Sequence, residues 1–445
     1  MEDPRLDPVS VADFLLNGTV CYPFTLFSGV YAAPPGAVTD VTPDDIQSEV
    51  YYRPDEGEDG APLQMWGMRL REQVQKVLLV GLEGKRNIKV LFSGGEDSRA
   101  VVSLLPPDVE CELVTFSDGY NREVKLAERA ARALGRPLRF VRRPEGFYRQ
   151  DIRARARLIG GVSDVRHTHV YGVLADSLGD ADAIVGGFMS DSLFKSMLVA
   201  NASRTLRRIG PETLTSDFST TPVGIADAKQ ARWLDPEVAS CVVERRNRHQ
   251  DLLAEFRPRS AVNWHWLWPV GCHHEQFAHY LAVQNLGRTV VEPFLSPQVY
   301  ALAASMPDEV RVDRKVFRAA FGSPMGRAGW LPTSSGRIPR LGGYAGHYVE
   351  LGTVVYRRAG DRAANLAARI VGRKPINQGA WSGDYGAFRN GLAGELSGNQ
   401  FERARELVNA ILTAKEANAF FKPGGGDAPD LARNRLLQVA YLMDE

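Results

Sequence analysis

The first half of the chain alternates between short apolar runs and segments in which apolar residues recur at helical spacing. The apolar runs expected to form buried strands cover residues 89–92, 112–117, 137–141 and 183–187. The expected helices carry the apolar positions of residues 63–82, 100–105, 122–134 and 172–178. Strands alternating with helices at these lengths predict an α/β fold with a parallel sheet and crossover helices.

The two ends of the chain have other patterns. Residues 1–60 hold short apolar runs broken by Pro and Gly, which predict one small helix and a few short strands but no independent core. The acidic segment 54–61 is typical of a linker, and beyond residue 200 the pattern is mostly helical. We therefore expect a short N-terminal appendage (1–60), an α/β core (61–200) and a mostly helical C-terminal lobe (201–445).

Composition narrows the class of protein. Of 445 residues, 44% are hydrophobic and 24% charged, and the formal net charge of +1 offers no electrostatic basis for binding nucleic acid or a membrane surface. No signal-peptide pattern and no apolar run of about 18 residues is present. The four cysteines lack the spacing of a zinc ribbon, an iron–sulfur cluster or a disulfide framework. We expect a soluble, cytoplasmic protein.

The strongest chemical signal is the turn Ser93–Ser98 (SGGEDS), between the strand at 89–92 and the helix that follows. Its two glycines let the backbone approach a ligand, and the helix N-terminus presents unpaired N–H groups to an anion. Asp97 cannot bind phosphate directly, so its presence is best explained by Mg²⁺ between the carboxylate and phosphate oxygens. The turn predicts a cradle for a nucleotide with its metal, although a Gly-Gly turn alone can be only a tight connection.

A second carboxylate, Asp191, lies in the segment GGFMSDSLF (186–194), just beyond the expected strand at 183–187. Ligands of open parallel sheets bind at the carboxyl ends of strands. Taken alone, Asp191 is typical of the N-cap of a following helix. Together with Asp97, we interpret it as the second Mg²⁺ ligand.

These pieces, in this order, resemble the synthetase domain of the asparagine synthetases and their relatives, the β-lactam synthetases and lasso-peptide cyclases. The SGGEDS turn looks like the pyrophosphate loop (PP-loop) of the N-type ATP pyrophosphatases, and it lacks the Gly-Lys-Ser/Thr ending of a Walker A loop. The other matching segments are TFSDGYN (115–121), GGFMSDSLF (186–194) and EPFLS (292–296) with the helix end at 302–307. Residues 1–60 also look like the remnant that joins the family's two domains. The resemblance spans most of residues 10–340 and implies a PP-loop, adenine nucleotide α-hydrolase-like fold.

The resemblance implies a site for ATP and Mg²⁺. It places Leu91, Phe116, Ser117, Gly186 and Gly187 around the adenine, Ser93, Gly94, Gly95 and Ser98 on the pyrophosphate, and Asp97 and Asp191 on Mg²⁺. In the implied reaction, a substrate carboxylate attacks the α-phosphorus of ATP and releases pyrophosphate. An amine then attacks the acyl-adenylate to give an amide and AMP. Positioning and charge neutralisation would be the protein's main contributions.

The chain departs from the family at its beginning. Glu2 stands where asparagine synthetases carry a Cys nucleophile, and only residues 1–60 precede the expected core. We therefore expect no glutaminase domain and no glutamine hydrolysis. The nitrogen would come from free ammonia, from an amine on a substrate or from a separate amine-supplying protein.

Other departures concern the second half of the reaction. Phe188 and Thr289 occupy positions where the family commonly has its general base, and Ser192 replaces the Glu that commonly follows the second Asp. The proton acceptor for amide formation is therefore not identified. The family often supplies a Lys for the leaving pyrophosphate; the candidates here are Arg337 and Arg340, which can bind phosphate bidentately or serve as exposed structural residues.

Two further signals are weaker. Arg166 lies where the family has a basic residue near the nucleotide, with a surface role as the alternative. The Trp- and His-rich segment 264–274 has no ligand set of recognised metal spacing. It favours a packed aromatic helix, or it lines a substrate cavity.

We expect an ATP-dependent, AMP-forming amide ligase or cyclase that acts on a small-molecule or peptide carboxylate, as in natural-product biosynthesis. The alternative is a nucleotide-binding pseudoenzyme or partner subunit, because the general-base positions hold Phe188 and Thr289. Sulfur transfer to tRNA, another chemistry of such loops, fits poorly with the scattered cysteines and the near-zero net charge.

Overall fold

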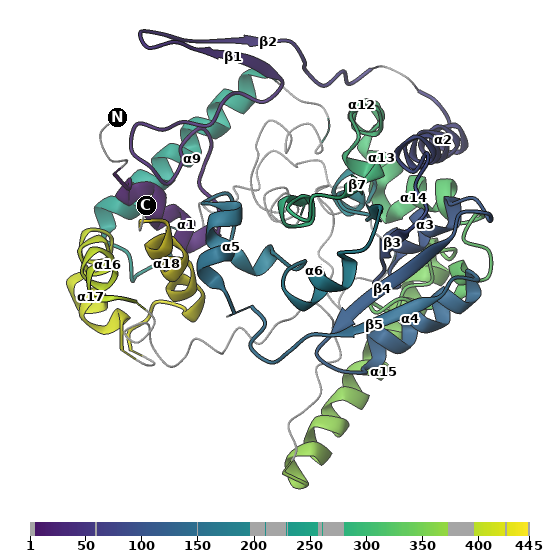
Figure 1. The fold of residues 1–445 in the computed structure, drawn as a ribbon. Coiled ribbons are helices and arrows are strands. Elements are labelled where there is room, and N and C mark those ends of the chain that lie inside the picture. The colour runs from purple at the N-terminus through teal and green to yellow at the C-terminus, as the bar shows by residue number, and fades with distance from the viewer. Residues whose placement is uncertain are drawn as a thin grey trace.

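The computed structural model describes residues 5–57, 60–148, 150–195, 230–256, 280–372, 396–422 and 425–443, together with residues 210, 228 and 260. The described parts form an α/β protein around a five-stranded parallel sheet of order β5-β4-β3-β6-β7 (Figure 1). The strands are β3 (Ile88–Leu91), β4 (Cys111–Ser117), β5 (Leu138–Arg142), β6 (Ala183–Val185) and β7 (Thr289–Val291). The predicted α/β class with a parallel sheet is confirmed.

The strand order creates a switch point between β3 and β6. The chain runs outward from β3 through β4 to β5, and then returns to the other side of β3 to form β6 and β7. Val90 in β3 lies opposite Leu113 of β4 on one side and Val185 of β6 on the other. In open α/β sheets the crevice at such a switch point is where ligands bind. The segments after β3 and after β6 therefore meet at the carboxyl edge of the sheet.

Helices cover both faces of this sheet. They are α2 (Leu63–Gly81), α3 (Glu96–Leu104), α4 (Arg122–Ala133), α6 (Val173–Leu178), α7 (Ser190–Phe194), α12 (Pro297–Ser305), α13 (Asp308–Arg311) and α14 (Lys315–Phe321). Val90, Leu113 and Val185 belong to a large buried cluster with side chains of α2, α3, α4 and α14. Val114 and Ile184, which alternate with them, belong to a smaller cluster with α6. Both faces of the sheet are therefore buried, as expected of parallel strands.

The structure corrects the sequence prediction at two elements. The sequence pattern predicts no strand beyond residue 187, yet β7 pairs in parallel with β6, with Val185 opposite Val291. A three-residue strand has no periodicity of its own, so its apolar run cannot be told from part of a helix. The pattern also does not predict the helix α5 (Ile152–Ile159). Short 3₁₀ helices cover Val165–His167, Pro293–Leu295, Val312–Arg314 and Ala328–Trp330.

The two ends of the chain meet in a second hydrophobic core (Figure 1). Its helices are α1 (Pro8–Asn17), α5, α9 (Pro236–Phe256), α16 (Gly398–Ile411), α17 (Ala414–Phe420) and α18 (Asp430–Leu442). α1 contacts α9, α16 and α18, and its Phe14 and Leu15 are fully enclosed. The predicted N-terminal helix is confirmed, and its apolar face is covered by the other end of the chain.

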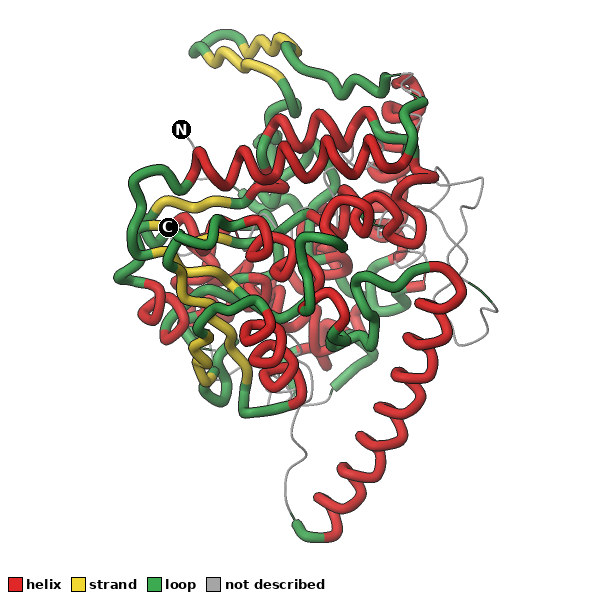
Figure 2. Tube along the Cα trace, turned by 90° about the vertical axis from the view of Figure 1, so that its right-hand side faces the viewer, coloured by secondary structure: helices red, strands yellow, loops and turns green. Residues whose placement is uncertain are grey.

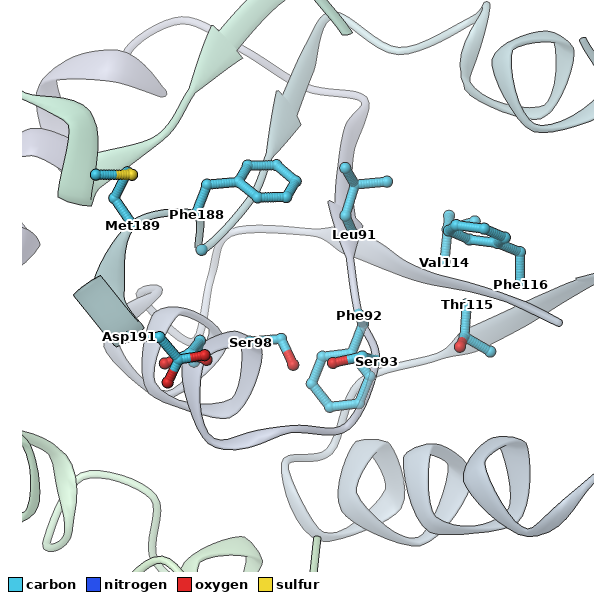
Figure 3. A pocket seen from close by; sticks show the side chains of 12 residues that line it. Leu91, Phe92, Ser93, Ser98, Val114, Thr115, Phe116, Phe188, Met189 and Asp191 are labelled. Carbon is cyan, nitrogen blue, oxygen red and sulfur yellow. The ribbon is translucent and has the colours of Figure 1, made fainter. Parts of the chain in front are cut away.

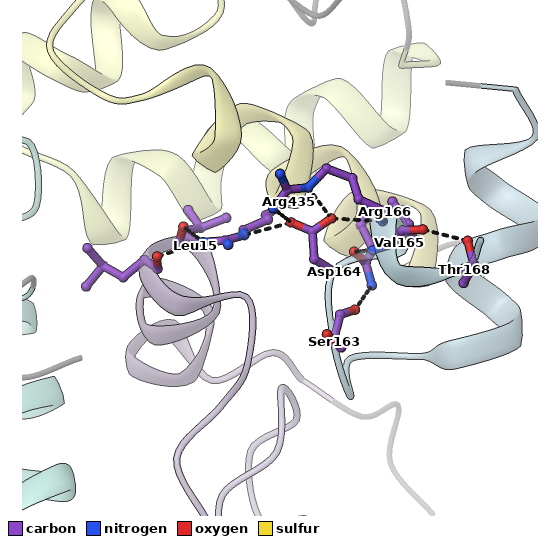
Figure 4. Close-up of polar contacts among 9 residues, drawn as sticks. Leu15, Ser163, Asp164, Val165, Arg166, Thr168 and Arg435 are labelled. Atoms are coloured by element: carbon purple, nitrogen blue, oxygen red, sulfur yellow. Dashed lines mark hydrogen bonds and ion pairs between the residues drawn. The ribbon is translucent and has the colours of Figure 1, made fainter. Parts of the chain in front are cut away.

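A buried polar network ties these ends together (Figure 4). Asp164 lies between Arg166, whose Nε is 2.8 Å from its Oδ1, and Arg435 of α18, whose Nε is 3.0 Å from its Oδ2. Arg435 also donates to the backbone carbonyl of Leu15 in α1. Burial would raise the pKa of Asp164, but the two guanidinium groups hold it below its ordinary value. Arg166 is therefore engaged in holding this network.

Two elements project from the rest of the described structure (Figures 1 and 2). One is the antiparallel hairpin of β1 (Ala37–Val41) and β2 (Ile46–Val50), which confirms the expected short N-terminal strands. The other is α15 (Gly343–Ile370), in which only His347 is buried. None of the described helices is long and apolar enough to cross a membrane.

Candidate functional site

A cavity of about 230 Å³ opens at the switch point of the sheet (Figure 3). It is lined by Leu91, Phe92, Ser93, Asp97, Ser98, Val114, Thr115, Phe116, Gly187, Phe188, Met189 and Asp191. Apolar side chains such as Leu91 and Phe188 form one side, and polar side chains such as Ser93, Ser98 and Asp191 form the other. The cavity can therefore receive a ligand with one apolar and one anionic or strongly polar part.

The backbone of the Ser93–Ser98 loop packs closely against α4 at Gly94. Gly94 has a φ of +70°, and a Cβ atom at this position would lie 2.6 Å from the Cα atom of Ala127 in α4. Gly95 is the N-cap of α3, and no side chain caps this helix. The N–H groups of the first turn of α3 and the positive end of its dipole are therefore available to an anion.

Three acidic side chains converge on one ammonium group at this loop. Nζ of Lys195 lies 2.5 Å from Oδ1 of Asp97 and 2.8 Å from Oδ1 of Asp191, with Oε2 of Glu96 at 3.5 Å. Ser190 donates a further hydrogen bond to Asp97. The N-cap of α7 is Met189, so Asp191 is not the helix cap that its position in the sequence resembles. The two predicted metal ligands are thus brought together around a single positive charge.

Burial and mutual charge perturb these groups. Burial raises the pKa of the Asp97 carboxyl to about 6, although Lys195 acts in the opposite direction. Burial by itself would lower the pKa of Lys195, but Asp191, Asp97 and Glu96 raise it above its ordinary value. Lys195 is therefore an ammonium ion at neutral pH. Within the described residues, no three His, Cys, Asp or Glu side chains are grouped so that they could hold a metal ion by themselves.

Another acidic residue, Glu292, follows β7 at the same edge of the sheet. Its side chain is buried, and its Oε2 accepts a hydrogen bond from the backbone N–H of Phe188 at 3.1 Å. A Cβ atom on Gly186 would lie 1.9 Å from the Oε1 atom of Glu292, so the carboxyl group requires a glycine there. Burial raises the pKa of Glu292 well above its ordinary value. Thr289, by contrast, begins β7 at the opposite, amino-terminal edge.

The remaining predicted residues divide into two groups. Gly94 and Gly95 form the loop beside the cavity, while Ser117 and Gly186 directly adjoin its lining residues. Arg337 and Arg340 are not among the lining residues: Nε of Arg337 lies 2.7 Å from Glu350, and the guanidinium of Arg340 lies over the Trp330 ring. The Trp- and His-rich segment 264–274 lies outside the described residues.

Sequence reasoning missed Lys195, and it quoted Glu292 only as part of the EPFLS segment without giving it a role. Each residue carries a signal in the sequence. Lys195 lies four residues after Asp191, the spacing at which helical side chains meet. Glu292 is a carboxylate directly after an apolar run, as Asp191 nearly is, but the three-residue β7 could not be identified as a strand.

Residues 86–159 match a family described as "Family of unknown function (DUF7411)". The matched segment begins just before β3 and ends with α5, so it contains the Ser93–Ser98 loop but not Asp191. No curated protein matches the chain significantly.

Proposed function

We propose that this chain is an ATP-dependent, AMP-forming ligase that activates a carboxylate of a small molecule or peptide and joins it to an amine or ammonia. The observation that carries the proposal is the meeting of the Ser93–Ser98 loop with Asp191 around one cavity at the switch point of a parallel sheet. Each is contributed by the segment after a different strand, β3 or β6. This is the arrangement expected for a polyphosphate held between backbone N–H groups and carboxylate-bound cations.

Features of the cavity support a nucleotide as its ligand. The left-handed backbone conformation of Gly94 and the uncapped N-terminus of α3 suit phosphate oxygens, which accept hydrogen bonds from backbone N–H groups. Ser93 and Ser98 add hydroxyl donors, and Leu91 and Phe188 provide apolar surface for a purine ring. The loop residues would orient the triphosphate so that its α-phosphorus faces an entering carboxylate.

Asp97 and Asp191 also fit a magnesium ion. Both carboxylates contact the same positively charged atom, Nζ of Lys195, so they can also reach one shared cation. In proteins, Mg²⁺ is bound by one or two carboxylates, with phosphate oxygens completing its coordination shell. When bound, Mg²⁺ would neutralise charge on the phosphates.

Glu292 is our candidate for the proton acceptor in amide formation. It is an acid at the carboxyl edge of the sheet and holds the backbone of Phe188, whose side chain lines the cavity. Burial raises its pKa, so its carboxylate is a stronger base than that of an ordinary Glu. Phe188 and Thr289 cannot exchange protons in this way.

The test is isotope exchange between pyrophosphate and ATP in the presence of a panel of amino acids and peptides as carboxylates. Asp97→Asn and Asp191→Asn should each lower the exchange rate by about 100-fold, because charge stabilisation of the transferring phosphoryl group is lost. Asp108→Asn is the matched control, since it makes the same change on an exposed carboxylate outside the cavity lining. Glu292→Gln should retain exchange and lose amide formation.

A chain that binds no ATP, or exchange that Asp97→Asn leaves unchanged, would overturn the ligase proposal. Nucleotide binding without exchange, for every carboxylate tried, would favour a nucleotide-binding partner subunit instead.

A further inference from the structure

Lys195 occupies the place where the two candidate metal ligands meet. Its side chain is 3% exposed, whereas that of Asp97 is 25% and that of Asp191 is 48% exposed. The ammonium group has three N–H donors, and three carboxylates surround it at 2.5, 2.8 and 3.5 Å. Lys195 therefore supplies one positive charge against the two negative charges of Asp97 and Asp191.

The surroundings hold Lys195 in this place. Nζ lies 4.5 Å from the centre of the Phe317 ring, at the distance of a cation–π contact. Glu96, the most distant of the three acids, is itself paired with Arg314, whose Nε lies 2.8 Å from Oε2. Lys195 follows the five-residue helix α7 directly, so its backbone is fixed next to Asp191.

We propose that Lys195 is an internal counter-ion that closes the carboxylate pair to divalent cations until an anionic ligand draws the ammonium away. A magnesium ion shared by the two carboxylates would lie close to the Lys195 ammonium group that both carboxylates now contact, and the two positive charges would repel each other. The metal therefore enters with the polyphosphate and not before it. The identity of that ligand rests on the proposed function, whereas the closure to metal does not.

The structure also has a place for such an anion, from which it would draw Lys195 away from the carboxylates. Asp97 and Glu96 both lie in the first turn of α3, whose N-terminus is uncapped. A polyphosphate bound there lies beside the ammonium group and offers it new acceptors. Asp191 is half-exposed, so a hydrated ion can reach it from the cavity once Lys195 turns toward the phosphates.

Metal binding without any nucleotide tests the proposal directly. Mn²⁺ is titrated into the full chain, and free Mn²⁺ is measured by electron paramagnetic resonance. Lys195→Met, which keeps an unbranched apolar side chain one atom shorter and removes the charge, should bind Mn²⁺ on the order of tenfold more tightly than the native chain. Adding Asp191→Asn to Lys195→Met should abolish that gain. Lys195→Arg, which keeps the charge, should bind as weakly as the native chain.

Equal Mn²⁺ affinity of the native chain and Lys195→Met would overturn the inference. Because Lys195→Met leaves three acids without their ammonium, its folding is followed by thermal unfolding with and without Mn²⁺. Mn²⁺ should raise the melting temperature of Lys195→Met and leave that of the native chain unchanged. A Lys195→Met chain that does not fold even with millimolar Mn²⁺ would also count against the inference that Lys195 closes the carboxylate pair to metal. If the Mn²⁺ results hold but ATP does not bind, the proposed function fails and this inference stands.

Discussion

The replacement Gly94→Ala tests whether the Ser93–Ser98 loop depends on close backbone approach. Gly94 has a φ of +70°, which costs a residue with a Cβ about 1–2 kcal/mol. The new Cβ would also lie 2.6 Å from the Cα of Ala127, a backbone atom in the buried face of α4 that cannot turn aside. Overpacking of this kind costs about 1–3 kcal/mol. Together these effects predict a loss of about 2–5 kcal/mol in the free energy of unfolding.

Two glycines of the same chain separate the conformational cost from the steric cost. Gly29 has a φ of +75°, and a Cβ added there would have no atom within 4 Å, so Gly29→Ala should lose only about 1–2 kcal/mol. Gly95 has a φ of −74°, and its Cβ would meet only the Oγ of Ser93, at 3.1 Å, so Gly95→Ala should lose less than about 1 kcal/mol, mainly because Ala is a poorer N-cap residue than Gly. Urea unfolding of the three variants gives the comparison. Equal losses for Gly94→Ala and Gly29→Ala would refute the role of the contact with Ala127.

Two further predictions concern buried charge. Glu292→Gln should match the native chain in stability at about pH 4 and exceed it at about pH 8, because the raised pKa of Glu292 makes the folded native chain hold a proton that the unfolded chain releases. Between the pKa of Glu292 in the unfolded chain and its pKa in the folded chain, the native chain should lose up to about 1.4 kcal/mol of unfolding free energy per pH unit. Unfolding free energies from urea titrations that change equally with pH in the two proteins would contradict this. Arg435→Met should cost about 3–5 kcal/mol in guanidinium unfolding, because the buried Asp164 loses its buried guanidinium partner. The matched change Arg248→Met, at a pair in which both side chains are exposed, should cost less than about 1 kcal/mol, and similar losses for the two would show that burial of the network does not matter.

The local pattern of apolar residues was sufficient to predict a helix or strand wherever that element carries its own periodicity. The strands β3, β4, β5 and β6 and the helices α2, α3 and α4 follow from apolar runs and helical spacing, and all are found close to their expected bounds. The same pattern could not identify β7, whose three residues become a strand only because β6 offers its open edge for pairing. Nor could it show that α1 is covered by helices from the far end of the chain.

For the candidate site, the sequence by itself determined the loop. Two glycines, two serines and Asp97 between a strand and a helix dictate a tight turn with free N–H groups, because these properties depend only on neighbouring residues. Tertiary structure alone decided which charges surround that loop. The order of the strands brings Asp191 and Lys195 to Asp97, places Glu292 beside Gly186, and leaves Arg337 and Arg340 paired elsewhere. Charge partners are set by distance through space, and the sequence shows only distance along the chain.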